Sequence, residues 1–600
     1  MTEHQTSPAF SENPSHEHHG FGKPTKLTYP VAVALVFILV LYGILLSQGI
    51  PQKWTEESNA SYRKIEQKAN DGAVSAPDAK KNDEKRRPPS YMLIPFAVLL
   101  LAIAFFPLVP AITHWWENNA NKFWVGSSLG LLALLYYYFV CDFPINQYWP
   151  GKSVVDPAVD GSFAVTKAVF VNAIIYEFFP FIVLLFALFT ITGGIRICSS
   201  LKATPFINTV ILTIGTLLAS FIGTTGAAML LIRPLLEMNR GRKHKVHTIV
   251  FFIFCVCNCG GCLTPLGDPP LFLGYLRGVA FEWPFFALWP MWAIVNLFLL
   301  TVYLLWDSLW FYPRELKESV ESKNDPSQKL FTISGWKLNA PLLLGVIAAI
   351  AFLDPGRPVP GTDWHPWFYM REAAQLGLAA ISLFFSSLSL RKENVFNFFA
   401  IGEVAALFFG IFLCMQAPLQ ILSVEGKNIV AHAGGATGLN KEKLFFWTTG
   451  LLGSALDNAP TYVVFFEAAR AVSPETEAEH KKWREETGRE FEPVPVRGGT
   501  IDHKLLIAVS LGTVFMGAMT YIANAPNFLV KAIAEQDKVA MPSFFGFMGY
   551  SCLIVLPVLT VMAFVFLYDP PATEIFEPCP YCDGTGHIVS QQHLSDFQRP

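Results

Sequence analysis

A break in an apolar segment is the feature that most constrains how this chain can fold. An apolar run at residues 247–257 leads into residues 258–278, which read NCGGCLTPLGDPPLFLGYLRG and contain three prolines and five glycines. Pro265, Pro269 and Pro270 lack a backbone N–H donor and clash with the preceding turn of a regular helix. We therefore expect a membrane-length segment whose helix is interrupted near its middle.

An acid lies within this break. Broken backbone at membrane depth is tolerated only where protein buries it or where it lines a water-filled cavity. Asp268 follows Gly267 and precedes two prolines, and an ionisable residue at that depth predicts a functional site. A discontinuous helix with a polar centre is typical of the ion or substrate site of a secondary transporter.

The composition also indicates a membrane protein. The 600 residues are 52% hydrophobic and 15% charged, whereas soluble domains carry about 25% charged residues. We predict an all-α polytopic protein embedded in the lipid bilayer of the plasma membrane, which in bacteria is the inner membrane. The net charge of −3 is informative about orientation and gives no indication of a nucleic-acid partner.

Alternating apolar and polar stretches divide the chain into successive parts. The first apolar span is long for a signal-peptide core, so we expect it to be retained, with cleavage as the alternative. The predicted parts are a disordered tail at 1–26, an N-terminal transmembrane helix at 27–49, a charged linker at 50–90, a first transmembrane repeat at 91–310, a cytoplasmic linker at 311–338, a second transmembrane repeat at 339–569 with a polar insertion at 473–500, and a tail containing Cys and His at 570–600.

Two apolar segments have polar, small or proline-containing centres. Residues 206–236 contain GTTGAA at 223–228, and residues 444–469 contain GSALDNAPTY at 453–462. A helix that enters the membrane, turns at mid-depth and leaves by the same face needs such a centre, so both are predicted as re-entrant hairpins. Lys and Arg flank the first hairpin on both sides, which places both of its ends in the cytoplasm. The resulting topology puts the charged linker outside, against the same rule.

These features recur in the same order in both halves. Glu177, the tip at Thr225 and the LGDPP break form the first series, and Glu403, the tip at Asp457 and IANAPN at 522–527 form the second. We predict an inverted-topology repeat, with two re-entrant hairpins and two broken helices meeting near the midplane. The alternative is that these glycines and prolines only pack membrane helices, where both residue types are frequent.

The two breaks resemble those of the ion transporter superfamily, which includes the divalent anion/sodium symporters, the arsenite and citrate (CitMHS-like) carriers and the NhaD-type Na⁺/H⁺ antiporters. GGCLTPLGDPPLFL is similar to the family pattern GGxxTxIGxPPNxx, and ANAPN matches the second break. The resemblance covers roughly residues 91–569. The acid in GDPP is closer to the antiporter-like members than to the dicarboxylate symporters.

The resemblance implies a scaffold domain and a mobile transport domain that carries the hairpins, an elevator-type alternating-access movement, and a homodimer. The sequence departs from the family pattern in two places. Leu271 stands where the first break usually has Asn, which removes an oxygen ligand. Neither tip reads Ser-Asn-Thr, the motif found at the tips of the dicarboxylate symporters.

A Na⁺ ion prefers hard oxygen ligands, which carbonyl groups at broken helix ends and hydroxyl, amide and carboxylate side chains supply. Burial favours a protonated carboxyl group and a bound cation favours the ionised form, so a proton and Na⁺ compete for the same acid. Asp268 and Asp457 are the leading candidates, with helix capping as the alternative role of each. The predicted ion- or substrate-binding residues are Thr224, Thr225, Asn258, Thr264 and Asp268 in the first repeat and Ser454, Asp457, Asn458, Thr461, Asn524 and Asn527 in the second.

The leading hypothesis for function is an Na⁺/H⁺ antiporter-like exchange of a small inorganic cation for protons, with Na⁺ and H⁺ as coupling ions and no cofactor. The alternative is Na⁺- or H⁺-coupled symport of citrate or another dicarboxylate, because the N-termini of half-helices attract anions. The sequence shows no nucleophile with its base, no phosphate loop and no catalytic metal spacing. An enzyme is therefore not expected.

Other polar residues carry weaker signals. Glu177 and Glu403 are candidate proton relays, or alternatively mark the interfacial ends of their spans. The tail reads CPYCDGTGH at 579–587, a pattern with zinc-type ligands, for which a redox-active or disulfide pair and an unstructured tail are the alternatives. The candidate zinc ligands are Cys579, Cys582, His587 and His593.

Overall fold

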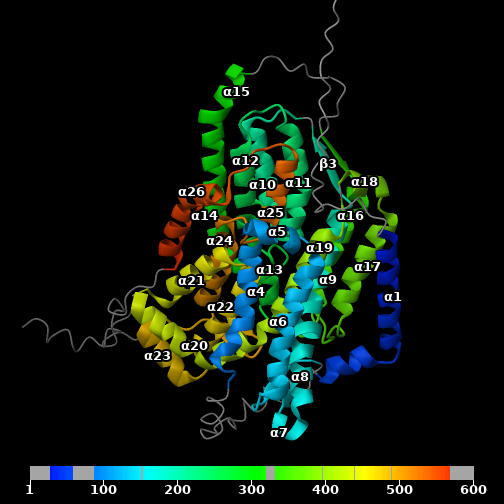
Figure 1. Cartoon of the computed structure of the whole chain (residues 1–600), viewed down its shortest axis with the longest axis vertical. Helices are drawn as coiled ribbons and strands as arrows, with labels where there is room; N and C mark the ends of the chain where they lie inside the picture. The colour runs from blue at the N-terminus through cyan, green and yellow to red at the C-terminus, as the bar shows by residue number, and fades with distance from the viewer. Residues whose placement is uncertain are drawn as a thin grey trace, which may run out of the picture.

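The computed structural model describes residues 28–57, 87–149, 153–199, 201–318, 331–394, 396–437, 439–487 and 489–567. The predicted tails at 1–26 and 570–600 and most of the charged linker at 50–90 lie outside these residues. Within the described ranges the chain folds into helices with short strand pairs between them, as Figure 1 shows. This confirms the predicted all-α class.

The first half contains the first hairpin and the first break. Its last helix continues past the predicted boundary at residue 310. The elements are α1 (Thr28–Ser47), η1 (Ser90–Leu93), α4 (Ile94–Phe105), η2 (Phe106–Leu108), α5 (Pro110–Trp116), α6 (Asn119–Phe139), β1 (Ile145–Gln147), β2 (Ser153–Val155), α7 (Pro157–Asp160), α8 (Ser162–Phe170), η3 (Val171–Phe178), α9 (Phe179–Thr192), β3 (Arg196–Ser199), α10 (Pro205–Ile222), α11 (Thr224–Met238), α12 (Val246–Cys255), η4 (Cys259–Cys262), α13 (Pro269–Leu276), α14 (Trp283–Trp306), η5 (Asp307–Phe311) and α15 (Tyr312–Glu318).

The second half contains the second hairpin and the second break. Its elements are β4 (Phe331–Ser334), α16 (Trp336–Phe352), α17 (Met370–Phe385), α18 (Leu388–Glu393), α19 (Phe399–Cys414), α20 (Gln416–Thr437), α21 (Lys441–Ala455), α22 (Asn458–Val472), α23 (Glu477–Thr487), β5 (Pro493–Val496), β6 (Gly499–Asp502), α24 (His503–Met516), η6 (Gly517–Met519), α25 (Ala525–Gln536) and α26 (Phe544–Phe566).

The described strands form short antiparallel pairs. β1 pairs with β2, β3 with β4, and β5 with β6. In the second of these pairs, Arg196 lies opposite Ser334, so the end of the predicted cytoplasmic linker folds back onto the segment that follows α9. These strands were not foreseen from the sequence.

The polar insertion at 473–500 is more ordered than the solvated loop that its charge pattern indicates. It contains helix α23 and most of the β5–β6 hairpin. Trp483 is only 3% exposed, and Arg489 forms ion pairs with Glu442 and Asp502 at 2.5 and 2.6 Å. A buried aromatic ring and a shared arginine therefore attach the insertion to the helices beside it.

Several helices are long and apolar enough to cross a membrane. Five qualify singly within the described residues, and the number rises to seven if each of two bent helix pairs counts as one span. Large apolar side chains point outward on α14, η5 and α26, including Leu297, Leu309 and Leu553 at 69, 74 and 80% exposure. Apolar surface on this scale suits lipid rather than water, so the chain is a polytopic membrane protein.

The core of the molecule surrounds the first break. Nine of the ten residues of α12 are buried, among them Phe251, Phe252 and Phe254. A helix that is apolar all round belongs in the interior of a large protein. The segment predicted as an interrupted membrane span is therefore surrounded by protein, where broken backbone can be tolerated.

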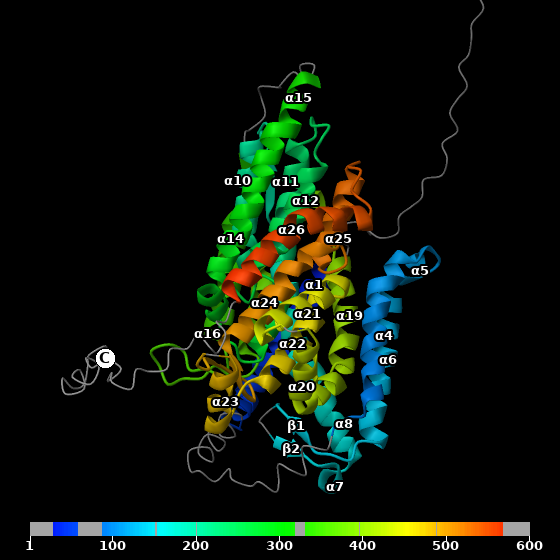
Figure 2. The same ribbon diagram turned by 90° about the vertical axis from the view of Figure 1, so that its left-hand side faces the viewer.

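Both predicted hairpins form helix pairs. α10 and α11 meet at Gly223, and α21 and α22 meet at Leu456 and Asp457. Figures 1 and 2 show the first pair in the upper half of the long axis and the second in the lower half. Their tips point toward each other across the middle of the molecule, where the two broken helices lie.

Candidate functional site

The two broken helices have the same construction. The first consists of α12, the 3-10 turn η4 and α13, and the second consists of α24, the 3-10 turn η6 and α25. Asp268 precedes α13 with φ −139° and ψ 142°, and Asn524 precedes α25 with φ −148° and ψ 134°. Neither side chain caps its own helix, so both are free to make contacts across the break.

Each hairpin tip is attached to the break of its own half by a backbone hydrogen bond. The N–H of Thr224 donates to the carbonyl of Gly267 at 2.8 Å, and the N–H of Asn458 donates to the carbonyl of Ala523 at 3.1 Å. Thr224 and Asn458 each open the second helix of their hairpin, and a helix N-terminus leaves backbone donors without intrahelical partners. The carbonyl groups of the breaks supply those partners.

A second contact between tip and break is also repeated. The hydroxyl of Thr264 donates to the carbonyl of Ser220, and the hydroxyl of Thr520 donates to the carbonyl of Ser454 at 2.6 Å. In each half the serine lies four residues before the tip residue and the threonine four residues before Asp268 or Asn524. The two halves thus share a pattern of contacts as well as an order of motifs.

Asp268 lies where both tips and the second break meet. Its side chain is 1% exposed. Oδ1 accepts hydrogen bonds from the hydroxyl of Thr224 at 3.1 Å and from Nδ2 of Asn524 at 3.0 Å, while Oδ2 accepts from Nδ2 of Asn458 at 2.8 Å. Segments separated by as many as 256 residues therefore place three neutral donors on one carboxylate.

A chain of amides extends from this carboxylate into the core. Nδ2 of Asn524 also donates to the carbonyl of Cys257 at 3.1 Å and lies 3.3 Å from Oδ1 of Asn258. Nδ2 of Asn258 donates to Oδ1 of Asn527 at 2.8 Å, and Nδ2 of Asn527 donates to the carbonyls of Gly517 and Thr520 at 2.9 Å. All of these side chains are buried, and a satisfied buried polar network rigidifies its surroundings.

Glycine is required where the backbone segments approach closely. A Cβ atom on Gly267 would clash with the backbone of Gly261, and one on Gly260 would clash with the carbonyls of Cys255 and Thr216. Gly223 turns the first tip with φ 82°, a conformation that side chains disfavour. The glycines of the GGCLTPLG motif therefore allow the two backbone segments of the break, at Gly261 and Gly267, to lie against each other.

Asp457 plays a different part from Asp268. Its Oδ1 accepts from the N–H of Ala459 at 3.0 Å and caps α22. Thr461 donates its hydroxyl to the carbonyl of Asp457, and Ser454 donates to that of Leu451, both at 2.8 Å. Thr225 is half-buried next to Thr224. The structure thus gathers Thr224, Asn258, Asp268, Asn458, Asn524 and Asn527 into one network, with Thr264 beside it. Among the described residues, the side-chain hydrogen bonds of Asp457, Thr461 and Ser454 stay within their own hairpin.

The two predicted proton relays form ion pairs away from this network. Glu177 on η3 pairs with Arg277 at the end of α13 at 2.8 Å, and Glu403 on α19 pairs with Lys122 on α6 at 2.5 Å. Lys122 is buried, while the Glu403 side chain is partly exposed. Their role as proton relays stays a prediction.

Four cysteines surround the first break. Cys255, Cys257, Cys259 and Cys262 are fully buried and unpaired, and no cluster of three or more His, Cys, Asp or Glu suited to a metal occurs among the described residues. The candidate zinc ligands Cys579, Cys582, His587 and His593 lie outside those residues.

Comparison with known families identifies the chain as a whole. Residues 85–567, about four fifths of the sequence, match the family CitMHS_2, described as "Putative citrate transport". The match spans both hairpins, both breaks and the insertion. No curated protein matches the chain significantly. The chain therefore belongs to the CitMHS_2 family of transport proteins.

Proposed function

We propose that the protein is a secondary active transporter in which Asp268 binds the transported or coupling cation in exchange for a proton. The observation that carries this proposal is the surroundings of the carboxylate. It is buried and contacts only hydroxyl and amide donors, and among the described residues no Lys, Arg or His forms an ion pair with it. An isolated buried charge is costly, so a proton or a bound cation stabilises this group.

The amide groups around Asp268 are suited to both states. Asn458 and Asn524 present N–H donors to the carboxylate, and each also carries a carbonyl oxygen. Rotation of either amide by half a turn would present that oxygen to a cation beside Asp268. With the hydroxyl of Thr224, this provides hard oxygen ligands of the kind that Na⁺ accepts from side chains and unwound backbone.

The proposed movement is of the elevator type, within a homodimer in the plasma membrane. The tips and breaks of both halves form one hydrogen-bonded unit through Thr224, Asn458 and Asp268, and the hairpins approach it from opposite ends of the molecule (Figures 1 and 2). An inverted repeat with such a shared centre supports alternating access by movement of that unit against the remaining helices.

A second candidate function is cation-coupled import of citrate or a related carboxylate. The family description favours it. In that case Asp268 would hold the coupling Na⁺ or H⁺, and the N-termini of α11 and α22 beside it would attract the anion. The two candidates share the role of Asp268 and differ in whether an organic solute moves.

Purified protein in proteoliposomes with an internal pH indicator distinguishes them. Steps of external Na⁺, Li⁺, K⁺ and citrate are applied separately, and uptake of labelled citrate is followed in parallel. Exchange predicts that one or more of the inorganic cations alone moves protons. Symport predicts labelled citrate uptake that depends on a Na⁺ or proton gradient. If neither response exceeds that of empty liposomes, the proposed function is wrong.

A further inference from the structure

The short helix α13 has its two ends in different surroundings. It begins directly after Asp268 and ends at Leu276, about 12 Å away at the rise of a helix. Its last residues are therefore too distant to touch a cation beside Asp268. Residues 275–278, which we call the α13 end, instead contact segments outside the Asp268 network.

Two helices of the second half bind the hydroxyl of Tyr275 in the α13 end. This hydroxyl donates to the carbonyl of Ile350 on α16 at 2.8 Å and accepts from Nη1 of Arg371 on α17 at 3.1 Å. Tyr275 and Arg371 are both buried, and Nε of Arg371 also donates to Glu372 at 2.9 Å. Buried polar groups are costly to leave unpaired, so these bonds hold α13 against α16 and α17.

The other residues of the α13 end also bind segments outside the network. Arg277 forms an ion pair with Glu177 on η3 at 2.8 Å, and both side chains are only 15% exposed. The carbonyl of Gly278 accepts from Nη2 of Arg357, which follows α16, at 3.1 Å. η3 is a π-helix, a rare conformation that is frequent at functional sites. The α13 end is thus bound by η3 as well as by α16 and α17.

The tip of the β5–β6 hairpin, in the polar insertion, completes this set of contacts. The N–H of Arg497 donates to the carbonyl of Arg277 at 2.7 Å. Cζ of Arg497 lies 4.7 Å from the ring centre of Tyr176 on η3, and its guanidinium group donates to the hydroxyl of that tyrosine. Gly278 has φ 100°, and a Cβ atom there would lie 2.8 Å from the backbone nitrogen of Arg497. This glycine therefore lets the tip contact α13 and η3 together.

The opposite end of the molecule is organised differently. Figure 1 shows β3 and α18 in the upper half and α23 of the insertion in the lower half. A cavity of about 280 Å³ lies between α11 and α25 on one side and β3 with α18 on the other.

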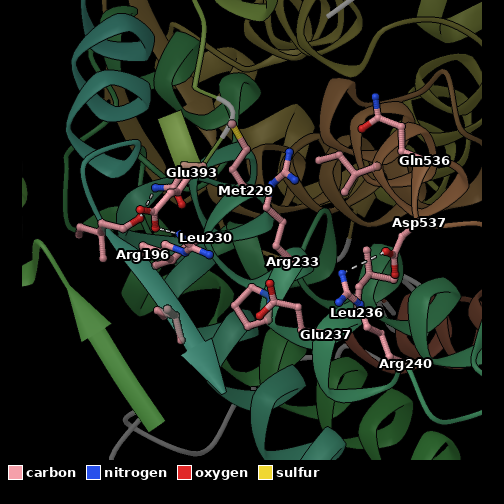
Figure 3. Close-up of a pocket in the computed structure, with 15 residues that line it drawn as sticks. Arg196, Met229, Leu230, Arg233, Leu236, Glu237, Arg240, Glu393, Gln536 and Asp537 are labelled. Carbon is pink, nitrogen blue, oxygen red and sulfur yellow. Dashed lines mark hydrogen bonds and ion pairs between the residues drawn. The ribbon is translucent and has the colours of Figure 1, made fainter. Parts of the chain in front are cut away.

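The ion pairs on the cavity wall stay within each side. Arg240 after α11 pairs with Asp537 after α25 at 3.7 Å, and Arg196 on β3 pairs with Glu393 on α18. Figure 3 shows the two pairs apart from each other, one on either side of the cavity. At the α13 end, by contrast, the ion pair with Glu177 connects a helix of the Asp268 network to a helix outside it.

We propose that the α13 end and the tip of the β5–β6 hairpin form a latch, which holds the Asp268 network against η3, α16 and α17 and has to open during transport. This inference rests on the proposed function, because an elevator-type movement displaces the network relative to those helices. The contacts of Tyr275, Arg277 and Arg497 then break together. With the ends of the first hairpin in the cytoplasm, as predicted, the latch lies at the outer face and is closed in this structure.

Hydrogen exchange, followed by mass spectrometry on the full-length protein in detergent, tests whether these contacts open as one unit. Tyr275→Phe removes both bonds of the hydroxyl and keeps the ring. Peptides covering the hairpin tip at residues 494–500 should then exchange about tenfold faster or more, although the hydroxyl of Tyr275 bonds to α16 and α17. Arg497→Gln, which keeps the backbone bond, should likewise speed exchange at residues 275–278.

Matched substitutions elsewhere serve as controls, and gel filtration checks the folding of every variant. Tyr42→Phe removes a hydroxyl that donates to the carbonyl of Phe368 at 2.9 Å, between α1 and the segment before α17. Arg484→Gln removes an exposed arginine of α23 in the same insertion. Both should leave exchange at the latch unchanged. The inference is wrong if folded Tyr275→Phe exchanges at the hairpin tip like wild type, or if folded Arg497→Gln does so at residues 275–278.

Flux in proteoliposomes of known orientation separates a latch from a contact that only supports the fold. A weaker latch raises the population of the state that is open at this face. In Arg497→Gln the apparent affinity for the cation to which wild type responds, Na⁺, Li⁺ or K⁺, should rise about threefold from the face of the insertion and fall from the opposite face.

Equal affinities to wild type, or shifts in the same direction at both faces, would overturn the latch. If wild-type protein moves no ion or solute, the proposed function fails instead. The exchange measurements then still decide whether the contacts of the latch open together, because they do not require transport.

Discussion

The first and second breaks share their backbone and differ in their charge. Both place an extended residue before a short helix. Both accept a hydrogen bond from the N–H of a hairpin tip, and both donate one from a threonine hydroxyl to a serine carbonyl of the hairpin. Yet the first break carries Asp268 where the second carries Asn524, and Leu271 where the second carries Asn527. One half supplies the negative charge and the other supplies amides.

This difference shows how two breaks of similar backbone leave a single charge between them. Two acids at the matching positions would face each other at the distance of a hydrogen bond, and like charges that close cannot both ionise. With Asn524 opposite Asp268, the second half instead donates to the carboxylate. Asn527 fills the space on its side by binding the carbonyls of Gly517 and Thr520, while Leu271 packs in the core.

The largest effect is expected from Asp268→Asn, which makes the two breaks alike. The substitution keeps the size of the side chain and removes the central charge, so cation-dependent flux in proteoliposomes should fall about 100-fold or more. Gel filtration of the variant serves as the control for folding. Flux within twofold of wild type would contradict the role assigned to Asp268.

Moving the charge across the centre is the second test. Asn524→Asp alone places two carboxyl groups about 3 Å apart and should impair both stability and flux. Combined with Asp268→Asn, it restores a single carboxylate at the matching position of the other half. The double variant should recover part of the flux lost in Asp268→Asn, and a double variant no better than either single one would show that the halves are not interchangeable.

Removal of one donor should have a smaller effect. Asn458→Ala takes away the 2.8 Å bond to Oδ2 of Asp268, and a hydrogen bond to a charged group contributes about 1.5–3 kcal/mol. The apparent affinity for the cation, measured from flux against cation concentration, should change about tenfold. Thr448→Ala on α21, whose hydroxyl bonds only to carbonyls of its own helix, is the matched control.

The smallest effect is expected at Asp457, the acid of the second tip. Because its carboxylate caps α22, Asp457→Asn should keep the cap and leave flux close to that of wild type. Asp457→Ala should lower thermal stability by about 1 kcal/mol, the usual contribution of a cap. A loss of flux in Asp457→Asn as large as that in Asp268→Asn would instead show that this acid also binds the ion.

The sequence was most informative where proline and glycine interrupt apolar segments. The first break and both hairpins lie within a few residues of their predicted positions, because these residues leave few conformations open. Asp268 stands out in the sequence because a charge in such a place is rare, and its role as a binding residue stays a prediction. Ser220 and Thr520 were missed, because a hydroxyl in an apolar segment looks ordinary in the sequence. Their role becomes visible only when the two halves are compared, since Ser220 lies four residues before the tip at Thr224 and Thr520 lies four residues before Asn524.

Partners that are distant in sequence could not be predicted. Arg277 and Lys122, which pair with Glu177 and Glu403, lie 100 and 281 residues away from them. The order within the polar insertion depends on burial of Trp483 and on the ion pairs of Arg489. The insertion is polar in composition whether or not these contacts form, and a polar composition indicates a loop. Such contacts arise from tertiary packing and leave no local pattern.

The four thiols around the first break allow its burial to be measured by chemical modification. Cys255, Cys257, Cys259 and Cys262 are sealed from solvent in this arrangement, whereas Cys552 is exposed on α26. An alkylating reagent therefore reaches these four buried thiols only when the centre opens. The native sequence thus contains its own reporter of that opening.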